Sequence, residues 1–240
     1  MNTVTTVLTV TDRIEYLESQ IESIENQTIK SDIVIHWNTD KEYTLDYPAF
    51  IYRNQQKRAP LYSRFYNSFS LETPYIFICD DDILPGKKYL ERCIDFSQKN
   101  IDPVCIVSYG MIFDEDETKY NVSERIHQKR FFSTPKVVNM GGQGYFFKKE
   151  ILKFYSDTGT YSSITGEDIH LGFTCWKNNI KTYVLDSDKE DIDTWRDLTL
   201  GKRGNDENAQ WRYNDFYFLR DSLISKYKSL GWKFRSKNLM

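Results

Sequence analysis

Strand-like and helix-like patterns alternate through the first half of this chain, and this alternation constrains its fold more than any other feature. Residues 3–10 alternate valine and leucine with threonine, as a strand does, and residues 13–26 repeat apolar side chains at helical spacing. Further strands are expected at 33–37, 49–53 and 75–79, with another helical pattern before the last of them. Strands that alternate with helices predict an α/β fold with a mostly parallel central sheet flanked by helices.

The second half is less regular, and we expect a few added or antiparallel strands there. Residues 114–136 are polar and mixed in charge, which indicates an irregular excursion, and residues 186–210 are charged and contain glycine, which favours a mobile loop. The remaining strands are expected at 104–108, 137–147 and 181–185, and the remaining helices at 87–98, 169–176 and 211–230.

Composition limits the classes of function. The chain has 240 residues, of which 40% are hydrophobic and 15% aromatic, enough for a sizeable core. Its formal net charge of −3 argues against extended binding to nucleic acid. The four cysteines are widely spaced without a CxxC pair, which favours buried free thiols in a reducing compartment. No secretory signal and no transmembrane segment is recognisable, so a cytoplasmic location is expected.

Three consecutive carboxylates form the first candidate site. The apolar run at 75–79 leads directly into Asp80, Asp81 and Asp82, and a Pro-Gly turn follows. Like charges this close are unfavourable unless a cation is present. Mg²⁺ and Mn²⁺ prefer oxygen ligands, and Mg²⁺ often completes its shell with substrate phosphates. Because open α/β sheets bind ligands at the carboxyl ends of strands, the motif indicates a metal-bridged diphosphate. The alternative is a solvated acidic turn.

Two further segments carry candidate chemistry. Glu167 and Asp168 follow Gly166 at the start of an expected helix, where the helix dipole favours carboxylates. The alternative for this pair is helix N-capping, a common role of aspartate. The glycine cluster at 141–144 indicates either a bulge or a place where a substrate approaches the backbone, with Gln143 bonding sugar hydroxyls.

Taken in order, these motifs resemble those of the GT-A fold glycosyltransferases. A Thr/Val-rich strand precedes a helix, a second strand ends in Asn38-Thr39-Asp40, and the Asp80–Asp82 motif, the glycine-rich strand and Glu167-Asp168 follow. The pattern is most similar to family 2-type enzymes and to small viral transferases that glycosylate capsid proteins. Glu-Asp-Ile-x-x-x-Phe at 167–173 is also similar to exostosin-like transferases.

The resemblance covers about residues 3–185 and implies one GT-A domain over residues 1–240. Residues 1–108 would form the nucleotide-sugar-binding half, residues 109–210 the acceptor half with its mobile loop, and residues 211–240 a closing helix.

The resemblance also implies roles for individual side chains. Asp82, with Asp80, would ligate Mn²⁺ or Mg²⁺, while Asp80 would also face the nucleoside and Asp81 the donor sugar. Asp168 would act as general base on the acceptor hydroxyl, with Glu167 beside it as the second catalytic candidate. The donor pocket would also include Thr9, Thr11, Arg13, Asn38, Asp40, Lys57, Arg58, Gly142 and Gln143.

One departure from the GT-A pattern concerns the metal. Many GT-A enzymes place a further ligand, often histidine, after the Glu-Asp helix, but here no histidine follows His170. We interpret His170 itself as a packing or capping residue. The metal would then be held mainly by Asp82, diphosphate and water, or with help from an aspartate in 186–197.

The sequence therefore predicts a metal-dependent glycosyltransferase that moves a sugar from a nucleotide-sugar, UDP-linked or similar, to a hydroxyl of a glycan or glycoprotein. Base catalysis by Asp168 favours inversion, whereas the exostosin-like pattern favours retention. One alternative is a catalytically inactive carbohydrate- or nucleotide-binding module, in which tryptophans such as Trp211 would suit sugar stacking. A sugar-1-phosphate nucleotidyltransferase is the other, but residues 9–13 lack the glycines that its phosphate loop needs.

Overall fold

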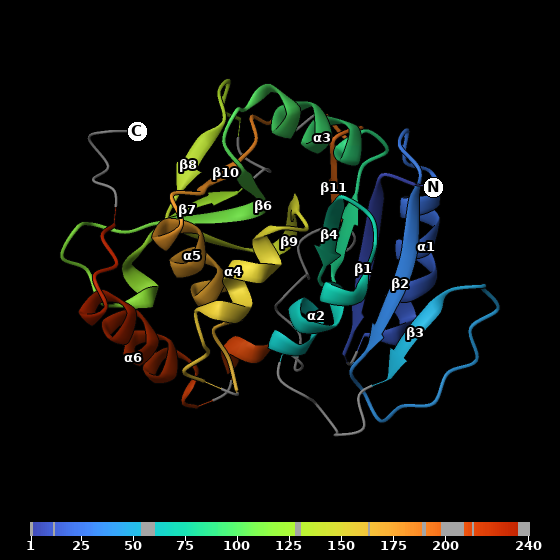
Figure 1. Cartoon of the computed structure of the whole chain (residues 1–240). Helices are drawn as coiled ribbons and strands as arrows, with labels where there is room; N and C mark the ends of the chain where they lie inside the picture. Colours follow the sequence, from blue (N-terminus) through green and yellow to red (C-terminus); the bar gives the residue numbers. More distant parts are fainter. Residues whose placement is uncertain are drawn as a thin grey trace.

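The computed structural model describes residues 2–11, 13–53, 61–127, 131–162, 164–188, 191–197, 209–212 and 214–234. Within these residues, nine strands form one mixed sheet and two more form a small separate sheet (Figure 1). The strands are β1 (Val4–Val10), β2 (Ser31–Trp37), β3 (Phe50–Arg53), β4 (Tyr75–Cys79), β5 (Ile83–Pro85), β6 (Val104–Ile112), β7 (Glu124–His127), β8 (Lys136–Val138), β9 (Met140–Lys148), β10 (Lys181–Val184) and β11 (Trp195–Asp197).

The helices cover both faces of the large sheet. They are α1 (Leu17–Glu25), α2 (Tyr62–Asn67), α3 (Tyr89–Lys99), α4 (Ile151–Asp157), α5 (Glu167–Lys177) and α6 (Phe216–Ser229). Apolar side chains of α1 and α3 pack into the core on one face, and those of α2, α4 and α5 into the core on the other. A third cluster joins α5, α6 and the chain after α6. The expected α/β class with a central sheet flanked by helices is confirmed.

The strand order is β3-β2-β1-β4-β9-β6-β10-β8, with β7 also paired to β6. The first four strands of this order are parallel to one another, as the alternation predicted. However, β9 runs antiparallel to both β4 and β6, so the sheet is mixed and not wholly parallel, as the less regular second half indicated. The described residues between β6 and β9 include no α-helix, which is the usual crossover between parallel neighbours.

Several elements differ from the sequence-based expectations. Helix α4 and strand β5 were not predicted, since both are short and neither has a clear period. Residues 186–210 were expected to form a loop, but residues 195–197 form β11, which pairs with β5 directly after the acidic turn. The mobility expected of this segment stays a prediction.

All four cysteines are buried thiols and none forms a disulfide, as their spacing indicated. No helix within the described ranges combines the length and apolar character needed to cross a membrane.

Candidate active site

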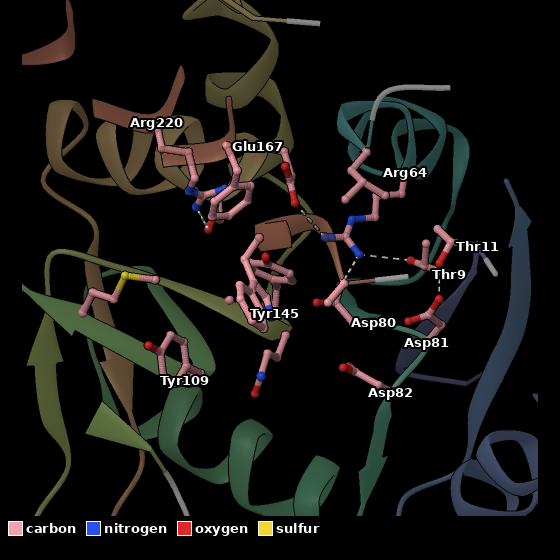
Figure 2. Close-up of a pocket in the computed structure, with 18 of the residues that line it drawn as sticks. Thr9, Thr11, Arg64, Asp80, Asp81, Asp82, Tyr109, Tyr145, Glu167 and Arg220 are labelled. Atoms are coloured by element: carbon pink, nitrogen blue, oxygen red, sulfur yellow. Dashed lines mark hydrogen bonds and ion pairs between the residues drawn. The ribbon is translucent and has the colours of Figure 1, made fainter. Parts of the chain in front are cut away.

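One cavity of about 480 Å³ lies where the carboxyl ends of β1 and β4 face the start of α5 and of α6. It brings together ten of the residues singled out from sequence: Thr9, Thr11, Arg13, Asp80, Asp81, Asp82, Gly142, Gln143, Glu167 and Asp168. Figure 2 shows Thr11, Asp81 and Asp82 at one side of the cavity and Arg220 and Tyr109 at the other. The two acidic motifs therefore share one site although more than eighty residues separate them.

The other four candidate residues are not among the side chains that line the cavity. β2 lies on the side of β1 away from β4, so β1 separates Asn38 and Asp40 from the acidic turn. The Asn38 backbone N–H donates to the carbonyl of Val10 and so continues the pairing of the two strands. Lys57 and Arg58 lie outside the described residues.

Two arginines, Arg13 and Arg64, partly offset the charge of the acidic turn after β4. Arg13 donates to Asp81 Oδ1 at 2.6 Å, and the Thr11 hydroxyl donates to the other oxygen of the same carboxylate. Arg13 Nη1 also lies 3.9 Å from Asp82 Oδ2. Asp80 pairs with Arg64. These opposite charges offset the repulsion within the triplet and fix the direction of its side chains.

Arg64, on α2, connects the two acidic motifs, and sequence reasoning missed it. Its side chain is 1% exposed, and it pairs with Asp80, donates to Thr9 Oγ1 at 3.1 Å and reaches Glu167 Oε1 at 3.3 Å (Figure 2). Its guanidinium also lies over the Tyr145 ring at 5.3 Å. In the sequence it is an ordinary arginine of a short helix, so no local signal distinguishes it.

Asp168 does not cap its helix. Gly166 occupies the N-cap position with φ +94°, and Asp168 lies one residue inside α5. Its carboxylate instead pairs with Arg220 of α6, which also donates to Thr165 Oγ1 at 3.1 Å and lies over the Tyr120 ring at 4.1 Å. Asp168 is thus not the N-cap residue, although its Oδ1 accepts the backbone N–H of Ile169 in the first turn at 2.8 Å. Arg220 is a second functional candidate that the sequence analysis missed.

Glu167 is held in an environment that favours its protonated form. Its Oε1 bonds Arg64, whereas Oε2 is buried without a hydrogen-bond partner in the described part of the chain. Burial, followed by the neighbouring Asp168 charge, raises the pKa of Glu167 to about 7, against the opposing effect of Arg64 and Arg220. A carboxyl group with a pKa near neutrality can both take up and release a proton at physiological pH.

The glycine cluster forms a bulge in β9, one of the two roles considered for it. Gly141 lets β9 approach β6, since a Cβ there would lie 2.3 Å from Val107 Cγ2. The register between β6 and β9 shifts at this point, and Gln143 adopts a positive φ of 72°. Its carbonyl accepts the Asp80 N–H at 2.8 Å, so the bulge supports the acidic turn. Gly142 and Gln143 also line the cavity.

The end of the cavity away from the acidic turn is aromatic. Five rings line it: Tyr109, Tyr120, Trp211, Phe216 and Tyr217. Trp211 and Tyr217 remain 42% and 41% exposed, and the Arg212 guanidinium lies over the Trp211 ring at 5.0 Å. Arg125 bonds the Tyr109 hydroxyl and lies over the Tyr120 ring at 5.3 Å. Except for Trp211, these residues carry no sequence signal, because they become neighbours only in the folded chain.

The oxygen donors at the acidic end fit a hard divalent cation. Asp82 lines the cavity, and Asp80 keeps 29% of its side chain exposed despite its arginine. No three acidic, histidine or cysteine side chains of the described residues gather into a complete metal site. A cation bound here would therefore need further oxygen ligands from a bound phosphate, as is common for Mg²⁺. His170 is no candidate ligand, because its ring nitrogens already contact the Tyr227 hydroxyl at 2.7 Å and the Tyr155 carbonyl at 2.9 Å.

Similar folds are found in two solved structures. The crystal structure of S. aureus TarS 1-349 has a TM-score of 0.57 at 12% identity, over 78% of this chain and 59% of that one. The crystal structure of S. aureus TarS has a TM-score of 0.59 at 12% identity, over 78% of this chain and 36% of that one. At this identity the likeness concerns the fold, and the chain spans less than two thirds of either structure. No curated protein matches the chain.

The fold and the order of the motifs place the protein in the GT-A class of glycosyltransferase folds, which confirms the resemblance. The family model described as "Glycosyl transferase family 64 domain" matches residues 4–129, just over half of the chain, and the chain belongs to this family. The match includes the Asp80–Asp82 motif and Arg64 but ends before Glu167 and Asp168.

Proposed function

We propose that the protein transfers a sugar from a nucleotide-sugar donor, UDP-linked or similar, to a hydroxyl group of a glycan or glycoprotein. One observation carries this proposal: the Asp80–Asp82 turn and the Glu167–Asp168 pair line a single cavity of about 480 Å³. This volume is typical of pockets that hold ligands of nucleotide size. Family membership supports the reaction class.

The donor diphosphate would lie at the acidic end. Asp82, with Asp80, would hold a Mn²⁺ or Mg²⁺ ion, which when bound supplies positive charge for the leaving diphosphate. Arg13 and Arg64 hold the carboxylates of this turn by ion pairs, so the site is ordered before the donor arrives. Such preorganisation avoids rearrangement during the reaction.

The acceptor would enter from the aromatic end. Trp211 and Tyr217 offer partly exposed ring faces, on which a sugar ring can stack. Asp168 would then accept the proton of the attacking hydroxyl, and its pairing with Arg220 fixes the orientation of the carboxylate. Glu167 is the second candidate base, because its pKa lies near 7. We favour inversion, since it requires only such a base next to the acceptor.

Calorimetric titration with UDP, with and without Mn²⁺, tests the proposal. We expect binding that depends on the metal and that weakens by about tenfold to a thousandfold in Asp82→Ala, on the order of 1–4 kcal/mol. Asp95→Ala on α3, an exposed carboxylate away from the cavity, is the matched control and should bind as the wild type does. Unchanged UDP affinity in Asp82→Ala would show that this residue does not hold the metal. UDP affinity that is the same in Mn²⁺ and in a metal chelator would show that binding does not depend on a metal.

A further inference from the structure

Helix α1 presents a row of polar side chains to the backbone that carries the acidic turn. Gln20 and Ser23 are three residues apart and share one face of the helix, and Gln27 follows two residues after its last residue, Glu25. Ser23 Oγ donates to the Pro85 carbonyl at 2.5 Å, and Gln27 Nε2 donates to the Gly86 carbonyl at 2.7 Å. Through these bonds α1 supports β5 and the chain that leads into α3.

Gln20 acts on the acidic turn itself. Its Nε2 donates to the carbonyl of Asp80 at 2.7 Å and to the carbonyl of Ile83 at 2.8 Å. A side-chain amide has two N–H donors, so one group holds both ends of the turn. Asp81 and Asp82 lie between these two ends, and both line the cavity.

Gln20 is a polar residue in the hydrophobic core, so its presence there needs a physical reason. The residue is 1% exposed and lies among the buried Leu17, Ile21 and Ile24 of the same helix. A buried amide is unfavourable unless it is hydrogen-bonded, and an apolar residue would satisfy packing alone at this position. The two bonds to the turn therefore give a physical reason for glutamine here.

We infer that Gln20 is a positioning residue of the donor site: it fixes the backbone of the Asp80–Ile83 turn so that the carboxylates of Asp81 and Asp82 point into the cavity. Gln20 does not line the cavity and has no part in the chemistry. Arg13 and Thr11 hold the Asp81 side chain, while Gln20 holds the main chain beneath it. The effect on ligand binding rests on the proposed function, because it requires donor binding at this turn.

The test compares the same substitution at Gln20 in α1 and at Gln27 just after it. Gln20→Met keeps the length of the side chain and removes both donors to the turn. Gln27→Met is the matched control, because it removes the bond to Gly86 and the bond that Gln27 Oε1 accepts from the Leu90 N–H at 3.0 Å. Both variants should lower the melting temperature. Only Gln20→Met should weaken binding of UDP with Mn²⁺, by about 10- to 100-fold, the effect typical of residues that orient metal ligands.

A second measurement needs no ligand. Hydrogen exchange of the unliganded proteins should be faster at residues 80–83 in Gln20→Met and at residues 86–90 in Gln27→Met. Unchanged exchange at 80–83, or wild-type UDP affinity in Gln20→Met, overturns the inference, as does equal weakening in both variants. A wild-type protein that binds no UDP contradicts the proposed function instead, and the exchange measurement still decides the role of Gln20.

Discussion

At the scale of single residues, the structure shows that replacing Asp168 has two separate effects. Its carboxylate pairs with the buried Arg220, so Asp168→Asn removes a base and also leaves a guanidinium without its partner. We expect turnover to fall by about 10²- to 10⁴-fold, the usual contribution of a general base. Donor affinity should stay near the wild-type value, because the acceptor hydroxyl is activated only in the transition state.

The measurement is a transfer assay beside calorimetry with UDP and Mn²⁺. Calorimetry also serves as the control for folding, since Asp168→Asn should lower stability through the unpaired Arg220. Near-normal transfer in this variant would contradict the assignment and would leave Glu167 as the base.

At this scale the sequence revealed the carboxylates but not their partners. Asp80–Asp82 and Glu167–Asp168 follow recognisable elements, so their placement at the ends of a strand and a helix was predictable. Arg64 and Arg220 look like ordinary helical arginines until the chain folds, because their ion pairs join residues 16, 103 and 52 positions apart. Only the tertiary structure selects them from the other basic residues.

At the scale of elements, the entry into α5 depends on one glycine. Gly166 has φ +94°, and a Cβ there would lie 2.2 Å from Leu223 Cδ1 of α6. We expect Gly166→Ala to lower the free energy of unfolding by about 1–3 kcal/mol through backbone strain and the clash. Because α5 carries Glu167 and Asp168 in its first turn, transfer activity should fall as well.

Gly159→Ala is the control for this prediction. Gly159 also has a positive φ, of 71°, but a Cβ there would meet nothing within 4 Å. This variant should lose less stability and keep its activity. Thermal unfolding and transfer assays of both variants check the difference, and equal effects would contradict the role of the α5 entry.

Two of the strands that the sequence missed depend on distant partners. β5 and β11 each have only three residues and exist because they pair with one another across 110 positions of the chain. β9 was expected as a strand, but its antiparallel direction follows from the return of the chain through residues 113–139. Local patterns define the long strands and helices well, whereas pairing over long distances leaves little trace in a single sequence.

At the scale of the whole molecule, Glu167 links stability to pH. Its pKa of about 7 in the folded protein lies above the ordinary value of 4.5, so the folded state binds its proton more tightly. Asp168 raises this pKa further, while Arg64 and Arg220 oppose the shift. The stabilising contribution of the protonated group is therefore complete below pH 4.5 and is lost as the pH rises through 7.

Glu167→Gln, which stays neutral, should remove this dependence. The unfolding free energy of the wild type minus that of the variant should fall by about 1–3 kcal/mol between pH 5 and pH 8, since one pKa unit corresponds to about 1.4 kcal/mol. Urea denaturation of both proteins at the two pH values gives the comparison. A difference that stays constant with pH would show that Glu167 titrates at its ordinary value.

The strand order also bears on how this protein is made. β9 lies between β4 and β6, Glu167 approaches Arg64, and β11 completes the pairing of β5 behind the acidic turn. A ribosome releases the Asp80–Asp82 segment long before it synthesises any of these partners, and a nascent chain folds only as its contacts become available. The donor site therefore assembles late, after residue 197 has emerged, and the exposed edge of β4 must be kept from pairing with other chains until β9 has been made.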